Sequence, residues 1–428
     1  MSRILISVFI IMVLLFSPLS AQDKNINELF QEAFAAYQQQ DYETFLNIFK
    51  TIHTMSPNSP NIQYNMACGY ALTGYGDSAL TLLDDLADRG IDLGAADDGD
   101  FTSIKDTEKF AEIMQKLNKN TAPVKNSSHV ISLPENDIMI EGITYDKVGK
   151  KFYFGSMNKK KIFVLNNLGR IAEFKKSGED GLHGAVGMEI DPLRRIIWVC
   201  SNQAPYVEGF EMGSIPSGEV FKFDLEKGML LGRYSSPDDG KPHSFNDLTI
   251  RTSTGDIYIT DDLSGAIYKV DYKNDKLSEF KPQGSFFSPN GITIGNDEKY
   301  LYIAAYADGV YRVALDGGEA VRVDEPRGIS LYGIDGLYYH KNSLVAIQNG
   351  FNPDRVMQYH LNEDGDAITD EKKIEFNTDQ IDDPTTGTIV DGNFYYIGMS
   401  GMENFDNATW QMKPDSARVP ARILKAPL

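Results

Sequence analysis

The chain has 428 residues, of which 42% are hydrophobic and 24% charged, a composition that excludes fibrous and disordered proteins. Its 61 acidic residues outnumber its 41 Lys and Arg residues, which gives a net charge of −20 at pH 7. That charge repels phosphate backbones and argues against nucleic-acid binding. The two cysteines, Cys68 and Cys200, are far apart, so a disulfide framework and a thiolate zinc site lack the residues they need. Any metal must therefore be held by oxygen atoms.

The first residues of the chain are typical of a secretory signal peptide. A basic start is followed by the apolar run 4–16 and by small residues up to Ala21, after which cleavage is expected. The apolar run is too short to cross a bilayer as a helix, and no later stretch is more apolar. The sequence therefore predicts a signal peptide over 1–21 and a mature protein that is secreted or periplasmic, without a membrane span. An uncleaved anchor is the alternative.

Residues 25–120 show helical periodicity and an internal repeat. Two segments match when they are shifted by 34 residues, which aligns Ala33 with Ala67. This repeat length resembles that of tetratricopeptide repeats. The sequence predicts a tetratricopeptide-like helical domain that ends in a capping helix at about 107–117 and could dock a protein partner, with a generic helical bundle as the alternative. The polar segment 121–128 is predicted to be a linker.

Beyond residue 128 the pattern changes to short strands separated by turns of Gly, Asp and Asn. Three kinds of strand recur six times in a fixed order, and a fourth kind follows only five times. An orphan strand at 129–134 can supply the missing edge, which pairs the first and last strands of the domain and closes a ring. The sequence therefore predicts an all-β six-bladed β-propeller over 129–428, preceded by the α-helical domain.

The innermost strand of each predicted blade carries one residue in a common column. At spacings of 45, 60, 44, 45 and 51 positions, these residues are Glu141, Val186, Asn246, Asn290, Asp335 and Thr386. Because innermost strands line the central channel, two carboxylates and two carboxamides are expected to converge there. The column contains no Lys, Arg or His side chain to compensate the negative charges. Burying the two negative charges together without a partner costs several kcal/mol each.

A divalent cation removes that cost. Hard oxygen ligands from Glu141, Asn246, Asn290 and Asp335 select Ca²⁺, or Mg²⁺, over zinc and copper, and the loose geometry of a site built from four blades suits Ca²⁺. Asn and Asp before Gly are also common turn residues, which is the alternative explanation for each position taken alone. The acids at 247, 261 and 262 are assigned to turns or to positions behind the ligands.

Four short motifs at these positions resemble a known family. They are Ile-Glu-Gly-Ile at 140–143, Phe-Asn-Asp-Leu at 245–248, Ser-Pro-Asn-Gly-Ile at 288–292 and Ile-Asp-Gly-Leu at 334–337. They look like the Glu, Asn, Asn, Asp signature of the senescence-marker protein/gluconolactonase/luciferin-regenerating enzyme family, to which paraoxonases and diisopropylfluorophosphatase are related. The resemblance implies a catalytic divalent cation, usually calcium, on which a lactone or phosphoester docks. It implies Glu141, Asn290 and Asp335 as ligands, and Asn246 as a ligand or substrate contact.

Two positions depart from the pattern of that family. Ser244 stands where members that hydrolyse sugar lactones often place an arginine, which argues against an aldonolactone substrate. His183 lies near the position of the catalytic histidine of paraoxonase-like enzymes, about one residue out of register. His183 is a candidate base, and the alternative is a role at the surface or in packing. The same two interpretations apply to His243.

Two long loops between second and third strands are expected on the same face as the metal site. Loop 202–217 carries Tyr206 and Phe210, and loop 400–420 carries Trp410. Together with Asn246, these aromatic side chains are predicted to form an apolar substrate pocket, which favours a hydrophobic lactone or ester over a sugar. Packing of the aromatic residues against one another is the alternative.

The sequence therefore predicts an exported, calcium-dependent hydrolase of the lactone or ester type. Asp335 is the predicted catalytic residue, either as the nucleophile or as the base that activates a water molecule, and His183 is the second candidate. The sequence contains no Gly-x-Ser-x-Gly motif, which argues against a serine hydrolase. The alternative is a non-catalytic binding propeller that keeps the metal as a structural plug while the helical domain docks a partner.

Overall fold

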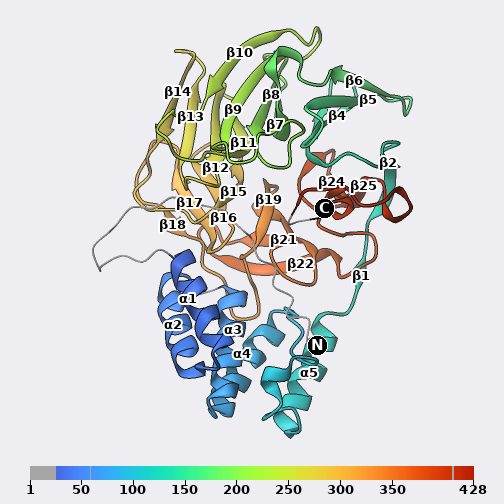
Figure 1. The fold of residues 1–428 in the computed structure, drawn as a ribbon. Coiled ribbons are helices and arrows are strands. Elements are labelled where there is room, and N and C mark those ends of the chain that lie inside the picture. Colours follow the sequence, from blue (N-terminus) through green and yellow to red (C-terminus); the bar gives the residue numbers. More distant parts are fainter. Residues whose placement is uncertain (1–25, 58, 407–408) are drawn as a thin grey trace. The chain divides into compact units, whose positions relative to one another are not determined.

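The computed structural model describes residues 26–57, 59–406 and 409–428, and these residues form two compact units. One unit comprises the described residues up to Ala122 together with Arg327–Ser330 and Phe351–Pro353, and the other comprises the remainder from Pro123 onward. The first unit is helical and the second consists of β-sheets (Figure 1). The predicted signal peptide at 1–21 lies outside the described residues. Within them, no helix is long and apolar enough to span a membrane.

The helical unit is built from helix pairs. Its α-helices are α1 (Ile26–Gln38), α2 (Tyr42–Met55), α3 (Pro60–Leu72), α4 (Gly76–Asp88) and α5 (Glu108–Asn120). The starts of α1 and α3 are 34 residues apart, and so are the starts of α2 and α4. Ala33 and Ala67 have no exposed surface, as close helix packing requires. The helical prediction is confirmed, including the capping helix, while the assignment to tetratricopeptide repeats stays a prediction.

The second unit is a six-bladed β-propeller, which confirms the predicted fold class (Figure 1). Each blade is an antiparallel sheet whose strands follow one another from the axis outward. Blade 1 contains β3 (Ile140–Asp146), β4 (Lys151–Ser156), β5 (Lys161–Leu165) and β6 (Ile171–Lys175). Blade 2 contains β7 (Gly184–Asp191), β8 (Ile196–Gln203), β9 (Ser217–Asp224) and β10 (Leu230–Ser235). Blade 3 contains β11 (Phe245–Arg251), β12 (Asp256–Asp261), β13 (Ile267–Asp271) and β14 (Lys276–Phe280).

The last three blades follow the same order, with additions at the outer edge. Blade 4 contains β15 (Pro289–Ile294), β16 (Tyr300–Ala305), β17 (Gly309–Ala314) and β18 (Val321–Arg322). Blade 5 contains β19 (Ile334–Tyr339), β20 (Ser343–Gln348), β21 (Arg355–Leu361) and β22 (Ile368–Phe376), to which β1 (Val124–Lys125) is added. Blade 6 contains β23 (Gly387–Val390), β24 (Asn393–Met399) and β25 (Arg422–Pro427), with β2 (Ser128–Ser132) at its edge.

The ring closes through the strand at the start of the propeller. β2 pairs antiparallel with β25. Blade 6 therefore combines a strand that precedes blade 1 in the sequence with the last strand of the chain. This confirms the prediction that an orphan strand near residues 129–134 supplies the missing edge. Closure leaves no open gap between the first and last blades, where a sheet edge would otherwise face solvent.

The segment 121–128, predicted as a linker, is in part a strand. Val124 and Lys125 pair with Phe376 and Glu375 of β22. The backbone N–H groups of residues 126 and 127 donate to Oε2 of Glu375 at 3.0 and 2.9 Å, and Glu375 has no exposed surface. Polar composition alone did not reveal this strand, because its partner lies about 250 residues further along the chain.

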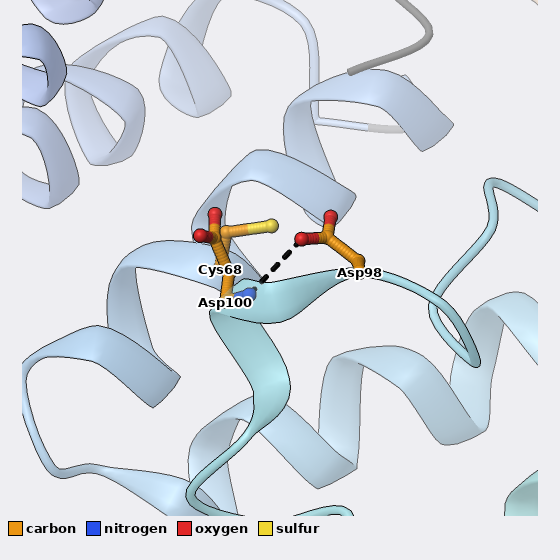
Figure 2. A group of neighbouring side chains, drawn as sticks. All are labelled: Cys68, Asp98 and Asp100. Atoms are coloured by element: carbon orange, nitrogen blue, oxygen red, sulfur yellow. Dashed lines mark hydrogen bonds between the residues drawn. The ribbon is translucent and has the colours of Figure 1, made fainter. Parts of the chain in front are cut away.

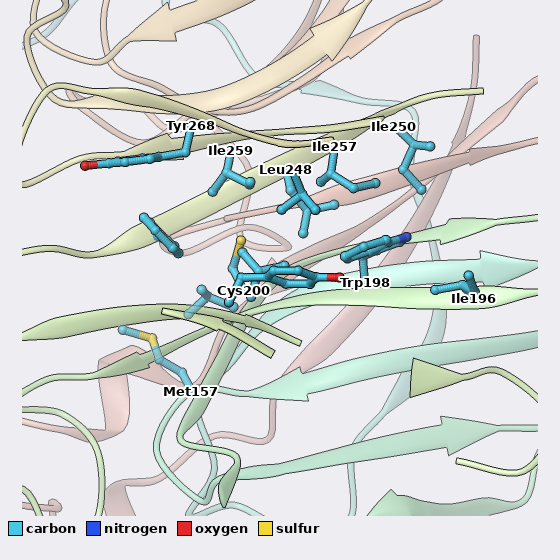
Figure 3. Close-up of a cluster of buried hydrophobic side chains, with 14 of the residues drawn as sticks. Met157, Ile196, Trp198, Cys200, Leu248, Ile250, Ile257, Ile259 and Tyr268 are labelled. Atoms are coloured by element: carbon cyan, nitrogen blue, oxygen red, sulfur yellow. The ribbon is translucent and has the colours of Figure 1, made fainter. Parts of the chain in front are cut away.

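The apolar cores lie between adjacent blades. Figure 3 shows one of them, in which Trp198 and Cys200 of β8 pack against Leu248 of β11 and Ile257 and Ile259 of β12. Four of these five side chains have no exposed surface, and Leu248 is 3% exposed. Burying each large apolar side chain contributes about 1.5–3 kcal/mol, so the blades form a stiff frame around the axis.

A β-bulge interrupts the pairing of five innermost strands at the predicted ligand column. The pairing shifts between Ile140 and Gly142, Ala185 and Met188, Phe245 and Leu248, Pro289 and Ile292, and Ile334 and Leu337. A bulge removes a residue from the regular ladder and redirects its side chain. Four of the five bulges contain a predicted ligand, so the local backbone, and not the strand alternation alone, sets the direction of these side chains.

Glycines beside the ligand column let the innermost strands approach one another closely. These strands contact one another in a closed cycle around the axis. A Cβ atom at Gly187 would lie 2.5 Å from the backbone oxygen of Asn246, and one at Gly291 would lie 2.5 Å from that of Asp335. The Thr386 hydroxyl joins the last blade to the first by donating to the backbone oxygen of Glu141.

This close approach predicts different effects for two Gly→Ala substitutions in one strand region. Gly291→Ala should lower the free energy of unfolding by about 1–3 kcal/mol, because the new methyl group would displace the backbone at Asp335. Gly295→Ala is the matched control, because the nearest atom to its added Cβ would be 3.5 Å away. Denaturant unfolding of both variants measures the difference. Equal stabilities would contradict the packing described here.

Ring closure predicts the outcome of two truncations that differ by ten residues. A chain that begins at Pro123 keeps β1 and β2, so it should fold into a propeller with its metal site intact. A chain that begins at Leu133 lacks both strands and should aggregate or unfold, because blade 6 loses its edge strand. Circular dichroism and size-exclusion chromatography compare the two. Equal folding of both chains would show that closure through β2 is dispensable.

Candidate metal centre

The four predicted ligands lie on the innermost strands of four blades, and these strands contact one another around the propeller axis. Glu141 and Asp335 are each only 7% exposed. The Oδ1 atoms of Asn246 and Asn290 are shielded from solvent and have no hydrogen-bond partner. An unpaired buried carboxamide oxygen costs about 1–3 kcal/mol. Two such oxygen atoms and two buried carboxylates, on strands that line one axis, form a donor set of the kind that a hard divalent cation satisfies.

The two carboxylates act on each other and lack a compensating cation. Burial raises the pKa of Glu141 well above its usual value, and the charges of Asp335 and Asp262 raise it further. Burial also raises the pKa of Asp335, and Asp383 is the strongest charge acting on it. No cationic side chain is among the groups that act most strongly on either carboxyl group. Their ionised forms therefore need a positive charge from outside the chain.

Three further acids surround this pair. Burial raises the pKa of Asp262 to about 7, of Asp247 to about 7 and of Asp383 to about 6. Asp247 accepts the backbone N–H of Leu248 at 2.9 Å, whereas Oδ1 of Asp262 is buried without a partner. Sequence reasoning placed Asp262 in a turn or behind the ligands and missed Asp383. Asp262 has no matching oxygen in other blades, and Asp383 lies in a loop outside every strand column.

Asn349, directly after β20, connects Asp335 to Asp383, and sequence reasoning also missed it. Its Nδ2 donates to Oδ2 of Asp335 at 2.8 Å, to Oδ1 of Asp383 at 3.4 Å and to the backbone oxygen of Pro384 at 3.1 Å. Its Oδ1 accepts the hydroxyl of Tyr306 at 2.9 Å. The hydrogen bonds from Asn349 lower the pKa of both acids, against the larger effect of burial. In the sequence, Asn349 is followed by Gly350, and such an Asn-Gly pair does not indicate a side chain that connects two acids.

Two of the three predicted pocket aromatics meet near the axis. The rings of Tyr206 and Trp410 are edge to face, with centroids 5.7 Å apart, and both line a cavity of about 240 Å³ together with Phe405. Burial raises the pKa of Tyr206, and Glu141 is the strongest charge acting on it, so the Tyr206 hydroxyl lies close to the channel acids. Phe210 is not among the residues that line the cavity.

The structure does not bring the candidate base His183 to the channel acids. Burial lowers the pKa of His183, and the strongest charges acting on it are Glu219 on β9 and Arg233 on β10, in the outer half of blade 2. The ring of His243 is buried, and its Nδ1 lies 2.6 Å from Oδ2 of Asp261. A role of either histidine as a base stays a prediction.

The helical unit contains a second group of potential ligands (Figure 2). The ligand atoms of Cys68, Asp98 and Asp100 lie within 4.8 Å of one another, and this is the one group of at least three His, Cys, Asp or Glu side chains to do so in the described residues. The hydroxyl of Tyr37 donates to Asp100 at 2.7 Å and that of Tyr64 to Asp98 at 2.8 Å. Burial raises the pKa of the Cys68 thiol. The carboxylates are satisfied and the thiol is neutral, so the cluster needs no metal.

The comparisons with known proteins concern the fold. No protein-family model and no curated protein match the sequence. A gluconolactonase from Xanthomonas campestris is 12% identical, with 71% of this chain and 95% of that chain covered and a TM-score of 0.48. A luciferin-regenerating enzyme is 11% identical, with 70% and 96% covered and a TM-score of 0.45. These structural neighbours are of the kind that the four motifs resemble, and no activity is carried over from them.

The raised pKa values predict how a cation stabilises the protein. Without a cation, the folded state retains protons that the unfolded state releases above about pH 4, so the free energy of unfolding should fall as pH rises from about 4 to about 7. Ca²⁺ compensates the ionised acids and should raise the melting temperature by several degrees at pH 7.5 and by less at pH 5. Thermal unfolding with Ca²⁺ and with a chelator measures the effect.

Asn290→Ala is the control for this experiment, because it removes one oxygen ligand and leaves every carboxylate in place. The variant should need more Ca²⁺ for the same rise in melting temperature. Elemental analysis of the purified parent protein should find about one calcium ion per chain. A melting temperature that does not respond to the chelator, or a protein that retains only zinc, would contradict the assignment.

Proposed function

We propose that the chain is an exported, calcium-dependent hydrolase that acts on a lactone or ester at the propeller axis. The observation that carries the proposal is the donor set of two buried carboxylates and two buried, unpartnered carboxamide oxygens. Glu141, Asn290 and Asp335 would hold the cation, with Asn246 as a further ligand or a contact to the substrate. A structural plug alone could be built from apolar side chains, so this polar set favours chemistry at the axis.

The aromatic side chains of the cavity that contains Tyr206 support the substrate class. Tyr206, Phe405 and Trp410 give it aromatic walls, and its volume of about 240 Å³ suits a small substrate. Ser244 lacks the charged guanidinium group with which an arginine would donate several hydrogen bonds to sugar hydroxyl groups. A small, hydrophobic lactone or ester fits these features better than a sugar lactone.

A bound divalent cation polarises a carbonyl oxygen and stabilises the negative charge that develops on it. In hydrolysis the oxygen of a water molecule bonds to the carbonyl carbon while a carboxylate of this chain takes one proton. The carbon–oxygen bond of the ester then breaks, and the carboxylic acid returns the proton to the leaving oxygen. The candidates for this proton exchange are Asp335, and Asp262 with its unpartnered oxygen.

Substitutions of the two acids test the proposal and assign the proton acceptor. Asp335→Asn keeps the size and an oxygen donor but removes the charge, so hydrolysis at saturating Ca²⁺ should fall by about 10²-fold or more if Asp335 is the base. Asp391→Asn, at an exposed turn of blade 6, is the matched control and should retain the parental rate. The assay is a panel of apolar lactones and aryl esters, with and without a chelator.

The same assay separates the other outcomes. Parental activity in Asp335→Asn together with a comparable loss in Asp262→Asn would move the base to Asp262. A parent protein that binds Ca²⁺ but hydrolyses no member of the panel would overturn the hydrolase and favour the binding propeller. Export is supported by the N-terminal sequence, and fractionation of expressing cells tests it. Docking of a partner by the helical unit is supported by the 34-residue spacing of its helices.

A further inference from the structure

The side chain of Asn349 lies between two carboxylates that repel each other. Its Nδ2 reaches Asp335 at 2.8 Å and Asp383 at 3.4 Å, while its Oδ1 accepts the hydroxyl of Tyr306. Asp335 belongs to the innermost strand of blade 5, Tyr306 follows β16 of blade 4, and Asp383 lies in the loop before blade 6. One carboxamide thus connects three consecutive parts of the ring.

The surroundings of Asn349 admit only one orientation of its amide group. Nδ2 faces three oxygen atoms, two of carboxylates and one of the Pro384 backbone. A flipped amide would direct Oδ1 at these oxygens and leave the Tyr306 hydroxyl facing an N–H group. Because a carboxylate accepts and cannot donate, the flipped form loses its hydrogen bonds to both acids. The two carboxylates therefore fix the direction in which Asn349 donates, and the Tyr306 hydroxyl donates to the Oδ1 atom that this orientation presents.

The backbone of Asp383 is held in place, so only a rotation of its side chain could separate its carboxylate from that of Asp335. Its backbone N–H donates to Oδ2 of Asp354 at 2.9 Å, and its φ of 52° is in the left-handed region. The next residue, Pro384, has no N–H group and restricts the backbone before it. The hydrogen bond from Asn349 is shorter to Asp335, at 2.8 Å, than to Asp383, at 3.4 Å, so Asp335 is the carboxylate that Asn349 holds more closely.

We propose that Asn349 is a positioning residue that holds Oδ2 of Asp335 against the charge of Asp383 and so leaves Oδ1 of Asp335 directed at the cation. This inference rests on the metal site of the proposed function, but not on the hydrolysis. Without the two N–H groups of Asn349, the repulsion from Asp383 rotates the Asp335 carboxylate out of the orientation in which it faces the axis. Side chains that orient a ligand in this way are commonly worth 10–100-fold in metal affinity.

Calorimetric titration of the full-length protein with CaCl₂ tests the inference. Asn349→Leu keeps the branched shape of the side chain but removes every side-chain hydrogen bond, and it should weaken Ca²⁺ affinity about 10–100-fold. Asn362→Leu is the matched control, because Asn362 makes a comparable set of bonds to residues 366 and 367 in the outer hairpin of blade 5. It should unfold more easily than the parent yet bind Ca²⁺ within about threefold of the parental affinity.

A double-mutant cycle with Asp383→Asn separates positioning from packing. If Asn349 acts against the charge of Asp383, then Asp383→Asn should restore at least about fivefold of the affinity that Asn349→Leu loses. A loss of affinity that Asp383→Asn does not change would show a packing role and overturn the inference. If Asn349→Leu does not fold, as judged by circular dichroism, Asn349→Ala takes its place in the cycle.

The outcomes also separate this inference from the proposed function. Parental affinity in a folded Asn349→Leu protein would overturn the role of Asn349 and leave the hydrolase standing. A parent protein that binds Ca²⁺ without hydrolysing any ester would overturn the hydrolase, and the cycle would still decide the role of Asn349. A parent protein that binds no divalent cation would overturn both.

Discussion

Uncompensated negative charge on the axis of a closed ring is the constraint on which the rest of this structure depends. Ring closure through β2 forces the six innermost strands into mutual contact, and this contact buries Glu141 and Asp335 in one channel. A surface pair of acids would be screened by water, but here their charges act on each other in a medium of low polarity. A divalent cation is the simplest group that stabilises the ionised pair and the unpaired carboxamide oxygens together.

The backbone arrangement that buries these negative charges also holds the candidate ligands in a defined geometry. The β-bulges release the ligand residues from the ladders, and the glycines beside them let one blade approach the backbone of the next. Each ligand is therefore fixed by two blades rather than by one strand. The apolar cores between the blades make the frame stiff, so small shifts of the ligands are costly. A site of this kind is preorganised before any cation or substrate arrives.

The propeller could be predicted because its blades repeat, and the same repeat aligns the four candidate ligands in one column. Six blades give six aligned strands, so Glu141, Asn246, Asn290 and Asp335 stand out as polar members of one column. Residues outside that column gave no comparable signal: Asn349 and Asp383 reach the site from a strand end and a loop, and β1 pairs with a strand about 250 residues away. Loop composition predicted the contact of Tyr206 with Trp410 but placed Phe210 in the same pocket, because composition does not fix the path of a long loop. The role of His183 was inferred from a family resemblance and stays a prediction; the strongest charges that act on it are Glu219 and Arg233 of blade 2.

The measurement that tests the central claim most directly is a crystal structure of the protein grown with Ca²⁺. The account predicts one strong electron-density peak on the propeller axis, with oxygen atoms of Glu141, Asn290 and Asp335 at about 2.3–2.6 Å and Asn246 either in the same shell or facing a ligand. The peak should disappear in crystals washed with a chelator. Calcium bound elsewhere, or an axis occupied only by water beside protonated carboxyl groups, would contradict the account.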